Sequence, residues 1–319
     1  MCSKSIEHSY WGEIPKSLMI DLLDDCREHG WIQALENRIM GRFPTIYKYI
    51  TSEDRADWAF WVPLNKESKV LDLGSGWGSL AFILADKCKY VLAIESVKER
   101  VEFINIRKEQ EDFKNVDVIQ ADALRPPVIS NTFDLIISNG LLEWVPLGDL
   151  ENHPEDVQKA FLSRTKELLN PGGTLYIGIE NRLGMNFLLG AKDHTGLPFT
   201  SIMPRFLASL ILQIRKPTKA FSEKSYSGYR TYTYHAGKYR KIMEECGFRD
   251  VQIFWAMPSY NHPSAMGNIN NPNTIKHYFS AINNPKSKAG KVLKILIDLL
   301  SVENIAIHFP PSYVIFAKV

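Results

Sequence analysis

The stretch Val70-Leu71-Asp72-Leu73-Gly74-Ser75-Gly76-Trp77-Gly78 decides the fold of this 319-residue chain. An apolar run ends in an acidic residue, a glycine-rich turn follows, and the apolar residues 79–85 come next. This order predicts a buried parallel strand, a tight loop and the first turns of a helix. Glycine suits the loop because a side chain would hold a ligand away from the backbone, and because a tight turn can require positive φ. The free N–H groups and positive dipole end of the helix favour a nucleotide-like ligand.

The spacing of the glycines separates two kinds of nucleotide site. A dinucleotide site has the pattern G-x-G-x-x-G, whose third glycine lets helix and strand pack closely. Here Ser79 stands in the place of that third glycine, and Asp72 lies two places before the first. The form D-x-G-x-G-x-G resembles motif I of the class I S-adenosylmethionine-dependent methyltransferases. A strand, turn and helix without a ligand remains the alternative for this stretch taken alone.

Length and composition indicate an ordinary soluble globular protein. The chain can bury a full core as one large domain or two small ones. Its formal net charge of +2 argues against a general nucleic-acid binder, and no nucleic-acid partner is expected. The four cysteines lie far apart, so neither a metal site nor a disulfide framework is expected. No apolar run can span a bilayer and no signal peptide begins the chain, so we expect a cytoplasmic protein without an integral membrane segment.

From residue 69 onward, strand patterns alternate with helix patterns. Strands are expected at 69–73, 90–94, 116–119, 133–138 and 173–179, and helices at 78–87, 97–111 and 155–169. A helix at 234–246 and strands at 251–255 and 313–317 follow, with a further helix near 291–300. The alternation predicts an α/β fold, a Rossmann-like seven-stranded, mostly parallel sheet with helices on both faces. The last two strands would be a parallel strand and its antiparallel neighbour.

The chain is expected to divide into an N-terminal helical segment, 1–68, and a methyltransferase domain, 69–319. Two long segments, 181–232 and 257–311, interrupt the regular pattern of the domain. Loops of this size in a compact domain are usually functional, and ligands of parallel sheets bind at the carboxyl ends of the strands. We therefore expect both insertions to form a cap over the ligand edge.

Three further segments extend the resemblance to class I methyltransferases. Glu95 ends the second strand, where the family's acidic residue accepts hydrogen bonds from both ribose hydroxyls, a task that suits a carboxylate. A nicotinamide-dependent enzyme could have an acidic residue at the position of Glu95 as well. Asp122 and Ala123 match the family's adenine motif, for which nicotinamide-dependent enzymes have no counterpart. Residues 133–140 resemble the fourth strand and its polar end beneath the methyl donor. The resemblance covers residues 69–180 and implies S-adenosylmethionine as cofactor. The cofactor-binding residues that it implies are Asp72, Gly74, Ser75, Gly76, Trp77, Gly78, Glu95, Ser96, Asp122, Ala123, Asn139 and Gly140.

Candidates for acid–base chemistry lie at two places. Glu143 comes just after the fourth strand, where the family often has an acceptor-side residue. His194, beside Asp193, can be an oriented imidazole that takes a proton near neutral pH, and Glu180 begins the same region of sequence. The alternative is that residues 193–196 only form a loop, with aspartate and glycine serving the backbone. An Asn-Pro-Pro-Tyr/Phe motif is absent after the fourth strand, which argues against methylation of a nucleic-acid adenine.

The acceptor is the least determined property. The segments 180–184 and 193–196, with 256–260, resemble methyltransferases associated with surface-polysaccharide glycosyltransferases. That resemblance implies a glycan acceptor, either a sugar hydroxyl or a phosphate on a glycan terminus. Two alternatives stay open: a small-metabolite methyltransferase acting on oxygen or nitrogen, and a non-catalytic cofactor-binding subunit of a glycosyltransferase complex. The apolar stretch 206–214 either packs on its own domain as a lid or meets a lipid-linked substrate or a membrane surface.

Overall fold

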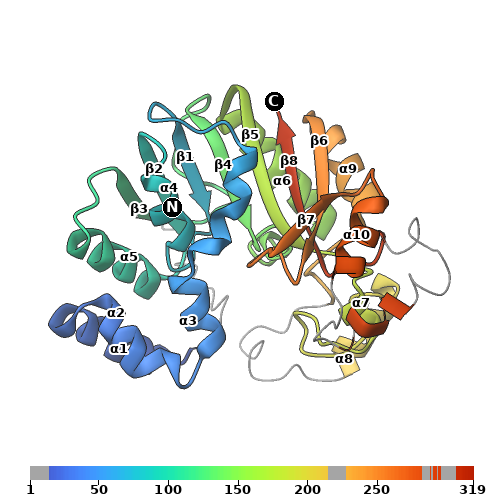
Figure 1. The fold of residues 1–319 in the computed structure, drawn as a ribbon, viewed down its shortest axis with the longest axis horizontal. Coiled ribbons are helices and arrows are strands. Elements are labelled where there is room, and N and C mark those ends of the chain that lie inside the picture. The colour runs from blue at the N-terminus through green and yellow to red at the C-terminus, as the bar shows by residue number, and fades with distance from the viewer. Residues whose placement is uncertain (1–13, 215–227, 282–287, 289, 293, 296–306) are drawn as a thin grey trace. The chain divides into compact units, whose positions relative to one another are not determined.

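The structure, a computed structural model, describes residues 14–214, 228–281, 288, 290–292, 294–295 and 307–319 (Figure 1). The strands are β1 Lys69–Leu73, β2 Tyr90–Glu95, β3 Val116–Gln120, β4 Phe133–Asn139, β5 Leu169–Glu180, β6 Arg249–Met257, β7 Ala265–Asn268 and β8 Ser312–Lys318. The α-helices are α1 Lys16–His29, α2 Trp31–Leu35, α3 Pro44–Thr51, α4 Ser79–Ala85, α5 Lys98–Gln110, α6 Pro154–Leu168, α7 Met185–Leu188, α8 Arg205–Ile214, α9 Ala236–Glu245 and α10 Asn273–Ala281. A π-helix η1 (Glu36–Met40) and two 3₁₀ helices, η2 (Glu53–Trp61) and η3 (Val145–Leu147), complete the order.

The expected strands and helices from residue 69 to 180 are confirmed, most of them to within two residues at either end. The main difference is β5, which begins at residue 169 where the sequence predicted 173. Of the expected helix at 291–300, residues 293 and 296–300 lie outside the described residues, as does the segment 1–13 at the N-terminus.

The chain divides into two compact units, each described by itself. The first unit contains residues 1–141, 164–175 and 319, and the second contains residues 142–163 and 176–318. The helices before residue 69 therefore belong to the same unit as β1 to β4. Residues 181–232 and 257–311 belong to the second unit, and their expected role as a cap stays a prediction.

The first unit is built on parallel strands. β1 pairs with β2 and with β4, and β2 pairs with β3, all in parallel register. The carboxyl ends of these strands therefore lie at one edge, where the loops 74–78, 96–97 and 121–123 leave them. This edge is where ligands of parallel sheets bind.

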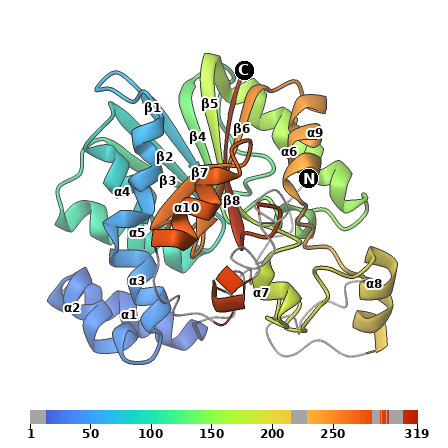
Figure 2. The same cartoon turned by 45° about the vertical axis from the view of Figure 1, so that its right-hand side comes forward.

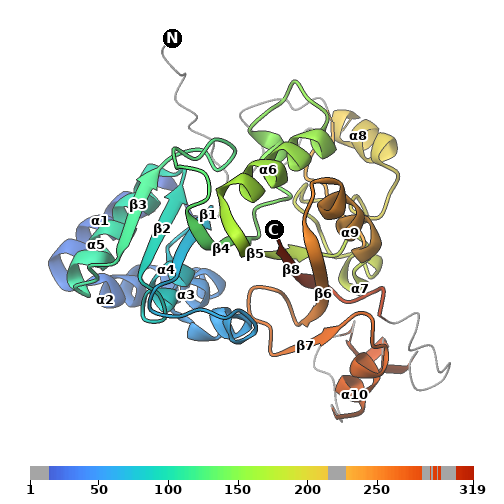
Figure 3. The same ribbon diagram turned by 90° about the horizontal axis from the view of Figure 1, so that it is seen from above.

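The leading helices pack against α5 within the first unit. Their core contains Leu22, Leu35, Ile39 and Phe103 among its fully buried members, and the partly buried Trp77 of the glycine-rich loop packs on it. Figure 1 and Figure 3 show α1 and α2 beside α5. The N-terminal segment thus supports one end of the glycine-rich loop.

The second unit is built on antiparallel strands. β6 pairs antiparallel with β8 and with β7, and α9 packs on β6 (Figure 3). α10 packs on β7 (Figure 2). The expected antiparallel pairing of the last two sequence-predicted strands is confirmed by β6 and β8.

The expected number of seven strands is wrong, because the described residues form a sheet of eight strands in the order β3-β2-β1-β4-β5-β8-β6-β7. The additional strand is β7, inside a segment that was expected to be an insertion. Its sequence has no apolar alternation, and it forms because it pairs with residues 254–257 of β6. Gly267 lies against the Trp255 ring, where a Cβ would come within 2.4 Å of Cζ2. The mostly parallel character applies only in part, since β6 pairs antiparallel with both β7 and β8.

Candidate active site

The glycine-rich loop, residues 74–78, follows β1 and begins α4. Gly74, Gly76 and Gly78 all have positive φ, at 67°, 59° and 76°. A Cβ on Gly74 would meet the Leu141 side chain at 2.9 Å, and one on Gly78 would meet Ile104 at 2.9 Å. A Cβ on Gly76 would meet no described atom within 4 Å. Gly74 and Gly78 are therefore needed for packing, whereas Gly76 leaves its backbone open to a ligand.

Glu95 ties this loop to the end of β2. Its Oε2 accepts a hydrogen bond from the Gly76 N–H at 2.8 Å. Its Oε1 accepts from the N–H groups of Ser96 at 2.9 Å and Val97 at 2.8 Å. The Ser96 hydroxyl also donates to Oε1, at 3.4 Å. A carboxylate offers about four lone-pair sites, so a ribose hydroxyl would have to displace or share one of these donors. Glu95 thus holds two loops of the edge together, and its contact with ribose stays a prediction.

Four buried polar atoms at this edge have no hydrogen-bond partner among the described residues. They are Asp72 Oδ2, Ser75 Oγ, Asp122 Oδ2 and Ser138 Oγ. They come from β1, from the loop after it, from the loop after β3 and from β4, all within the first unit. Buried polar atoms are normally paired, so such a group of acceptors and hydroxyls fits a ligand that brings its own donors.

Among the carboxyl groups at this edge, Asp72 has a strongly raised pKa. Burial raises the pKa of its carboxyl to about 7, the nearby Arg55 lowers it in part, and Glu95 raises it further. The side chain is almost inaccessible to solvent, so an ionised Asp72 would gain from a ligand cation. The ammonium group of an amino acid is a ligand group of that kind.

The remaining residues implied by the resemblance also lie at this edge. Trp77 meets the Phe103 ring edge-on at a centroid distance of 5.0 Å, and the Arg100 guanidinium lies 5.6 Å from its ring. Ala123 follows Asp122, whose Oδ1 accepts the Leu124 N–H at 2.9 Å. Asn139 ends β4 and Gly140 follows with a φ of 67°. All twelve residues that the sequence predicted for the cofactor therefore belong to the first unit.

A second polar group lies in the second unit and consists of Glu143, Glu180 and His194, the acid–imidazole cluster. His194 Nε2 lies 2.9 Å from Glu180 Oε2 and 3.8 Å from Glu143 Oε1. The Glu143 side chain is fully buried, while those of His194 and Glu180 are 17% and 25% exposed. The Trp144 ring packs on the imidazole with a centroid distance of 4.5 Å. Three residues that are distant in the sequence thus meet around one imidazole nitrogen.

Burial and mutual charge shift the pKa values of this cluster. Burial raises the pKa of Glu143 to about 7, which the His194 charge offsets in part and Glu180 reinforces. Burial lowers the pKa of His194, but the carboxylates of Glu180, Glu143 and Asp193 outweigh it and raise that pKa to about 9. Near neutral pH the imidazole is therefore a cation, and the Glu143 carboxyl exchanges its proton.

Asp193 contacts its own loop more directly than it contacts the imidazole. Its Oδ1 accepts hydrogen bonds from the Thr195 N–H at 2.8 Å and the Thr195 hydroxyl at 2.6 Å. Its Oδ2 accepts from the Tyr229 hydroxyl at 3.0 Å. These are the contacts of a loop-forming aspartate. The carboxylate nearest to the His194 nitrogen is Glu180, which the sequence placed in the region without singling it out.

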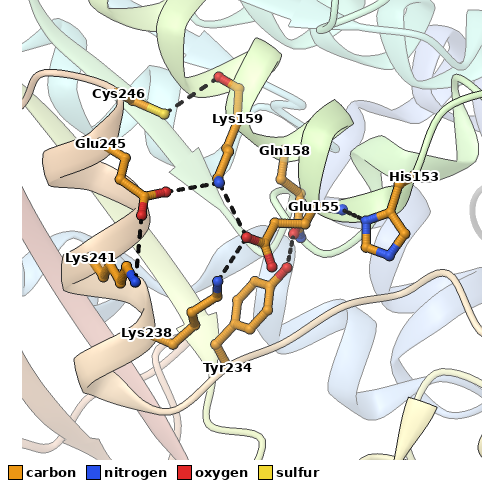
Figure 4. Close-up of polar contacts among 9 residues, drawn as sticks. All are labelled: His153, Glu155, Gln158, Lys159, Tyr234, Lys238, Lys241, Glu245 and Cys246. Carbon is orange, nitrogen blue, oxygen red and sulfur yellow. Dashed lines mark hydrogen bonds and ion pairs between the residues drawn. The ribbon is translucent and has the colours of Figure 1, made fainter.

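Gln158, which the sequence analysis missed, orders the segment before Glu143. It is fully buried in α6, and its Nε2 donates to the carbonyl groups of Leu142 at 2.9 Å and Tyr232 at 2.8 Å. Its Oε1 accepts from the Tyr234 hydroxyl at 2.9 Å, as Figure 4 shows. A glutamine in the middle of an amphipathic helix gives no local signal, so only its tertiary partners identify this role.

The side chains of the two residues after Glu180 donate hydrogen bonds to backbone carbonyl groups of other loops. Asn181 Nδ2 donates to the carbonyl groups of His308 and Pro310, each at 2.8 Å. Arg182 donates to the carbonyl groups of Ser201 at 2.9 Å and Met203 at 2.6 Å. The segment 180–184 therefore places Glu180 by fixing the loops around it.

Comparison with known proteins matches the central part of the chain to methyltransferases. Residues 64–194 match the family model of a methyltransferase domain. An uncharacterised methyltransferase of Mycobacterium tuberculosis is 34% identical over 118 residues, which cover 36% of this chain and 52% of that protein. A protein-L-isoaspartate O-methyltransferase of Rhodopseudomonas palustris is 26% identical over 136 residues, which cover 42% of this chain and 59% of that protein. The chain spans between 51% and 59% of the length of such curated relatives.

Solved structures include a phosphoethanolamine N-methyltransferase 2 of Haemonchus contortus in complex with S-adenosyl-L-methionine. It matches with a TM-score of 0.48 and 14% identity, over 93% of this chain and 59% of that one.

Residues 64–194 thus carry a methyltransferase domain, and S-adenosylmethionine is the cofactor of that domain. The residues of the first unit fit this molecule. Gly76 leaves the loop backbone open, and the buried oxygens of Asp72 and Asp122 lack donors among the described residues. Among those residues, no cluster of histidine, cysteine and carboxylate ligands could hold a metal ion, and no helix is long and apolar enough to cross a membrane.

Proposed function

We propose that the chain transfers the methyl group of S-adenosylmethionine to a hydroxyl group of a glycan or another sugar-containing acceptor. The cofactor supplies a methyl group on a sulfonium centre, and the acceptor oxygen attacks it in line with the leaving sulfur. Much of the rate of such a displacement comes from alignment and exclusion of water. The protein's part is to hold both molecules and to take the proton that the hydroxyl loses.

The observation that carries the choice of a hydroxyl is the buried Glu143 carboxyl. A hydroxyl gains from a general base as it is methylated, whereas a carboxylate or phosphate oxygen needs none. Glu143 has a pKa near 7, which is the range in which a base works best at neutral pH. Neither of its oxygens has a hydrogen-bond partner among the described residues, so both can accept a proton.

The same cluster disfavours an anionic acceptor. Glu143 and Glu180 supply two carboxylates and His194 one cation, so the cluster has no excess of positive charge. An acceptor phosphate placed beside these carboxylates would be repelled at close range. This supports a neutral sugar hydroxyl over a terminal phosphate.

Within the cluster, the group that accepts the proton of the acceptor hydroxyl is Glu143 and not His194. An imidazole whose pKa is raised to about 9 already holds its proton at neutral pH and cannot accept another. His194 and Glu180 are positioning residues, because the His194 cation lowers and the Glu180 anion raises the pKa of Glu143. Glu143 follows Gly140 by only three residues, so the base and the cofactor edge are near one another in sequence.

The experiment that tests the proposal combines two measurements on the full chain. Calorimetry with S-adenosylhomocysteine measures cofactor binding, and a panel of glycans and metabolites with S-adenosylmethionine is screened by mass spectrometry for a product heavier by one CH₂ unit. We expect binding, together with S-adenosylhomocysteine release and a methylated glycan.

Three outcomes contradict the proposal in different ways. Turnover only on a non-glycan metabolite identifies the small-metabolite alternative. Cofactor binding without turnover on any fraction identifies a non-catalytic binding subunit. Absence of S-adenosylhomocysteine binding overturns the function as a whole.

A further inference from the structure

The ten-residue helix α8, Arg205–Ile214, presents an apolar face to solvent. Phe206 and Ile214 are 76% and 74% exposed, and Leu210 is 49% exposed. At 100° per residue, these three side chains and Leu207 fall within about 100° of the helix circumference. Ala208, on the opposite side, is the buried residue of the helix. A surface helix normally buries its apolar face, so α8 has the reverse orientation.

Polar contacts hold α8 in this reverse orientation within the second unit. The Arg205 guanidinium lies 4.4 Å from the Tyr232 ring and 4.8 Å from the Tyr229 ring, and it donates to the Thr233 carbonyl. One turn later, the Ser209 hydroxyl accepts the Tyr229 N–H at 3.0 Å. Arg205 and Ser209 are four residues apart, so they lie on the same face. The side of α8 that carries Arg205, Ala208 and Ser209 is therefore turned toward its own unit, and the side with the exposed Phe206 and Ile214 is turned away from it.

Figures 2 and 3 show α8 standing apart from the strands of its own unit. Residues 206–214 carry no charged side chain. Beyond Ile214, where the described helix ends, the sequence of residues 215–227 contains Arg215, Lys216, Lys219 and Lys224 against the single acid Glu223. An uncharged apolar segment followed in the sequence by basic residues is the composition of segments that bind anionic lipid surfaces.

We propose that the outward face of α8, formed by Phe206, Leu207, Leu210 and Ile214, docks on the surface of an anionic lipid bilayer. The helix lies in the plane of the membrane, with its apolar side chains at the level of the acyl boundary and its polar face toward the protein. At about 15 Å it is far too short to span a bilayer. The contact is thus peripheral, and it is independent of the reaction proposed above.

The size of the face decides between a bilayer and a protein partner. A helix about 15 Å long and about 10 Å wide offers roughly 150 Å². A stable dimer or complex buries about 800 Å² on each partner. The α8 face is too small for that, whereas a bilayer takes up a few apolar side chains and adds attraction for basic residues.

The test measures co-sedimentation of the full chain with two kinds of vesicle. One kind is pure phosphatidylcholine, and the other is phosphatidylcholine mixed with phosphatidylglycerol. We expect binding to the mixed vesicles that weakens at high salt, and at least about tenfold weaker binding to the neutral ones. The double variant Phe206→Ser, Ile214→Ser should lose at least about tenfold of its partition onto mixed vesicles.

Two controls keep the result interpretable. Ile129 is 81% exposed on a loop of the first unit, so Ile129→Ser removes an equally exposed apolar side chain and should leave partition unchanged. Binding of S-adenosylhomocysteine and the circular dichroism spectrum show that each variant is folded.

The proposal is overturned if the unsubstituted chain ignores mixed vesicles, or if the double variant binds them as well as the unsubstituted chain does. It is also overturned if light scattering shows a dimer that the double variant converts to a monomer, because a second copy then covers the face. None of these outcomes depends on whether the chain methylates a glycan.

Discussion

Asp72 and Glu95 at the cofactor edge and Glu143 of the acid–imidazole cluster are all buried carboxyl groups, but their hydrogen-bond partners differ. At the cofactor edge, Glu95 accepts three backbone N–H groups, and Asp72 has an oxygen without a donor among the described atoms. In the second unit, Glu143 and Glu180 face the His194 imidazole. The first arrangement holds loops in place and accepts donors from a ligand, whereas the second sets the charge of one carboxyl.

Burial alone therefore does not distinguish a carboxylate that binds a ligand from one that acts as a general base. Burial raises the pKa of Asp72 and of Glu143 alike, each to about 7. The cation that acts on Glu143 is a histidine, which can lose its proton, whereas the cation that acts on Asp72 is Arg55, which stays charged. The predictions below test this distinction, in order of decreasing effect.

The largest effect is expected for Glu143→Gln. Removal of a general base lowers kcat by between about 10²- and 10⁴-fold, while the affinity for S-adenosylhomocysteine stays the same. The matched control is Glu155→Gln in the same unit. Glu155 pairs with Lys238 at 2.7 Å and Lys159 at 3.2 Å (Figure 4), and its loss should leave kcat unchanged. Equal kcat values for the two variants would contradict the role of Glu143.

Gly76→Ala should weaken S-adenosylhomocysteine binding by about 100-fold, equivalent to about 2.7 kcal/mol, because its Cβ enters the space left for the ligand. Gly172→Ala is the control. Both glycines have positive φ and no described atom within 4 Å of an added Cβ, so both variants carry similar backbone strain. Calorimetry that finds the two variants equally weakened would assign the effect to strain and not to the cofactor.

The pH dependence of kcat separates the two positioning residues. Since Glu143 must be ionised to accept a proton, kcat should rise as the pH increases through about 7. His194→Gln removes a charge that lowers the pKa of Glu143, so the rise should move up by about one pH unit. Glu180→Gln removes a charge that raises it, so the rise should move down by a similar amount. Shifts in the same direction for both variants would contradict the proposed cluster.

The smallest effect is expected for Asp193→Asn. The variant exchanges charged for neutral hydrogen bonds to Thr195 and Tyr229, which should lower the free energy of unfolding by about 1 kcal/mol. Turnover should change by less than about threefold. Asp149→Asn is the control, because Asp149 caps another loop of the same unit through Glu151 and Asn152. A large loss of kcat for Asp193→Asn but not for Asp149→Asn would show that Asp193 takes part in the reaction.

The elements that could be predicted from the sequence are those with local causes. β1, the glycine-rich loop and α4 form one continuous stretch, in which apolar burial, positive φ and the helix start are each set by neighbouring residues. β7 could not be predicted, because Ala265–Asn268 become a strand only by pairing with β6. The orientation of α8 could not be predicted either. Its apolar pattern predicts that the apolar residues face inward, but the contacts of Arg205 and Ser209 turn them outward.

The sequence by itself determined the class of domain and predicted the edge for its cofactor, because Asp72, Gly76, Glu95 and Asp122 lie at or just after the carboxyl ends of strands that the hydrophobic pattern reveals. Only the tertiary structure decided which groups share the acid–imidazole cluster. Glu180 and His194 are 14 residues apart and Glu143 precedes Glu180 by 37, so no local pattern relates them. Their charges act on one another only because folding removes them from water and brings them within 4 Å.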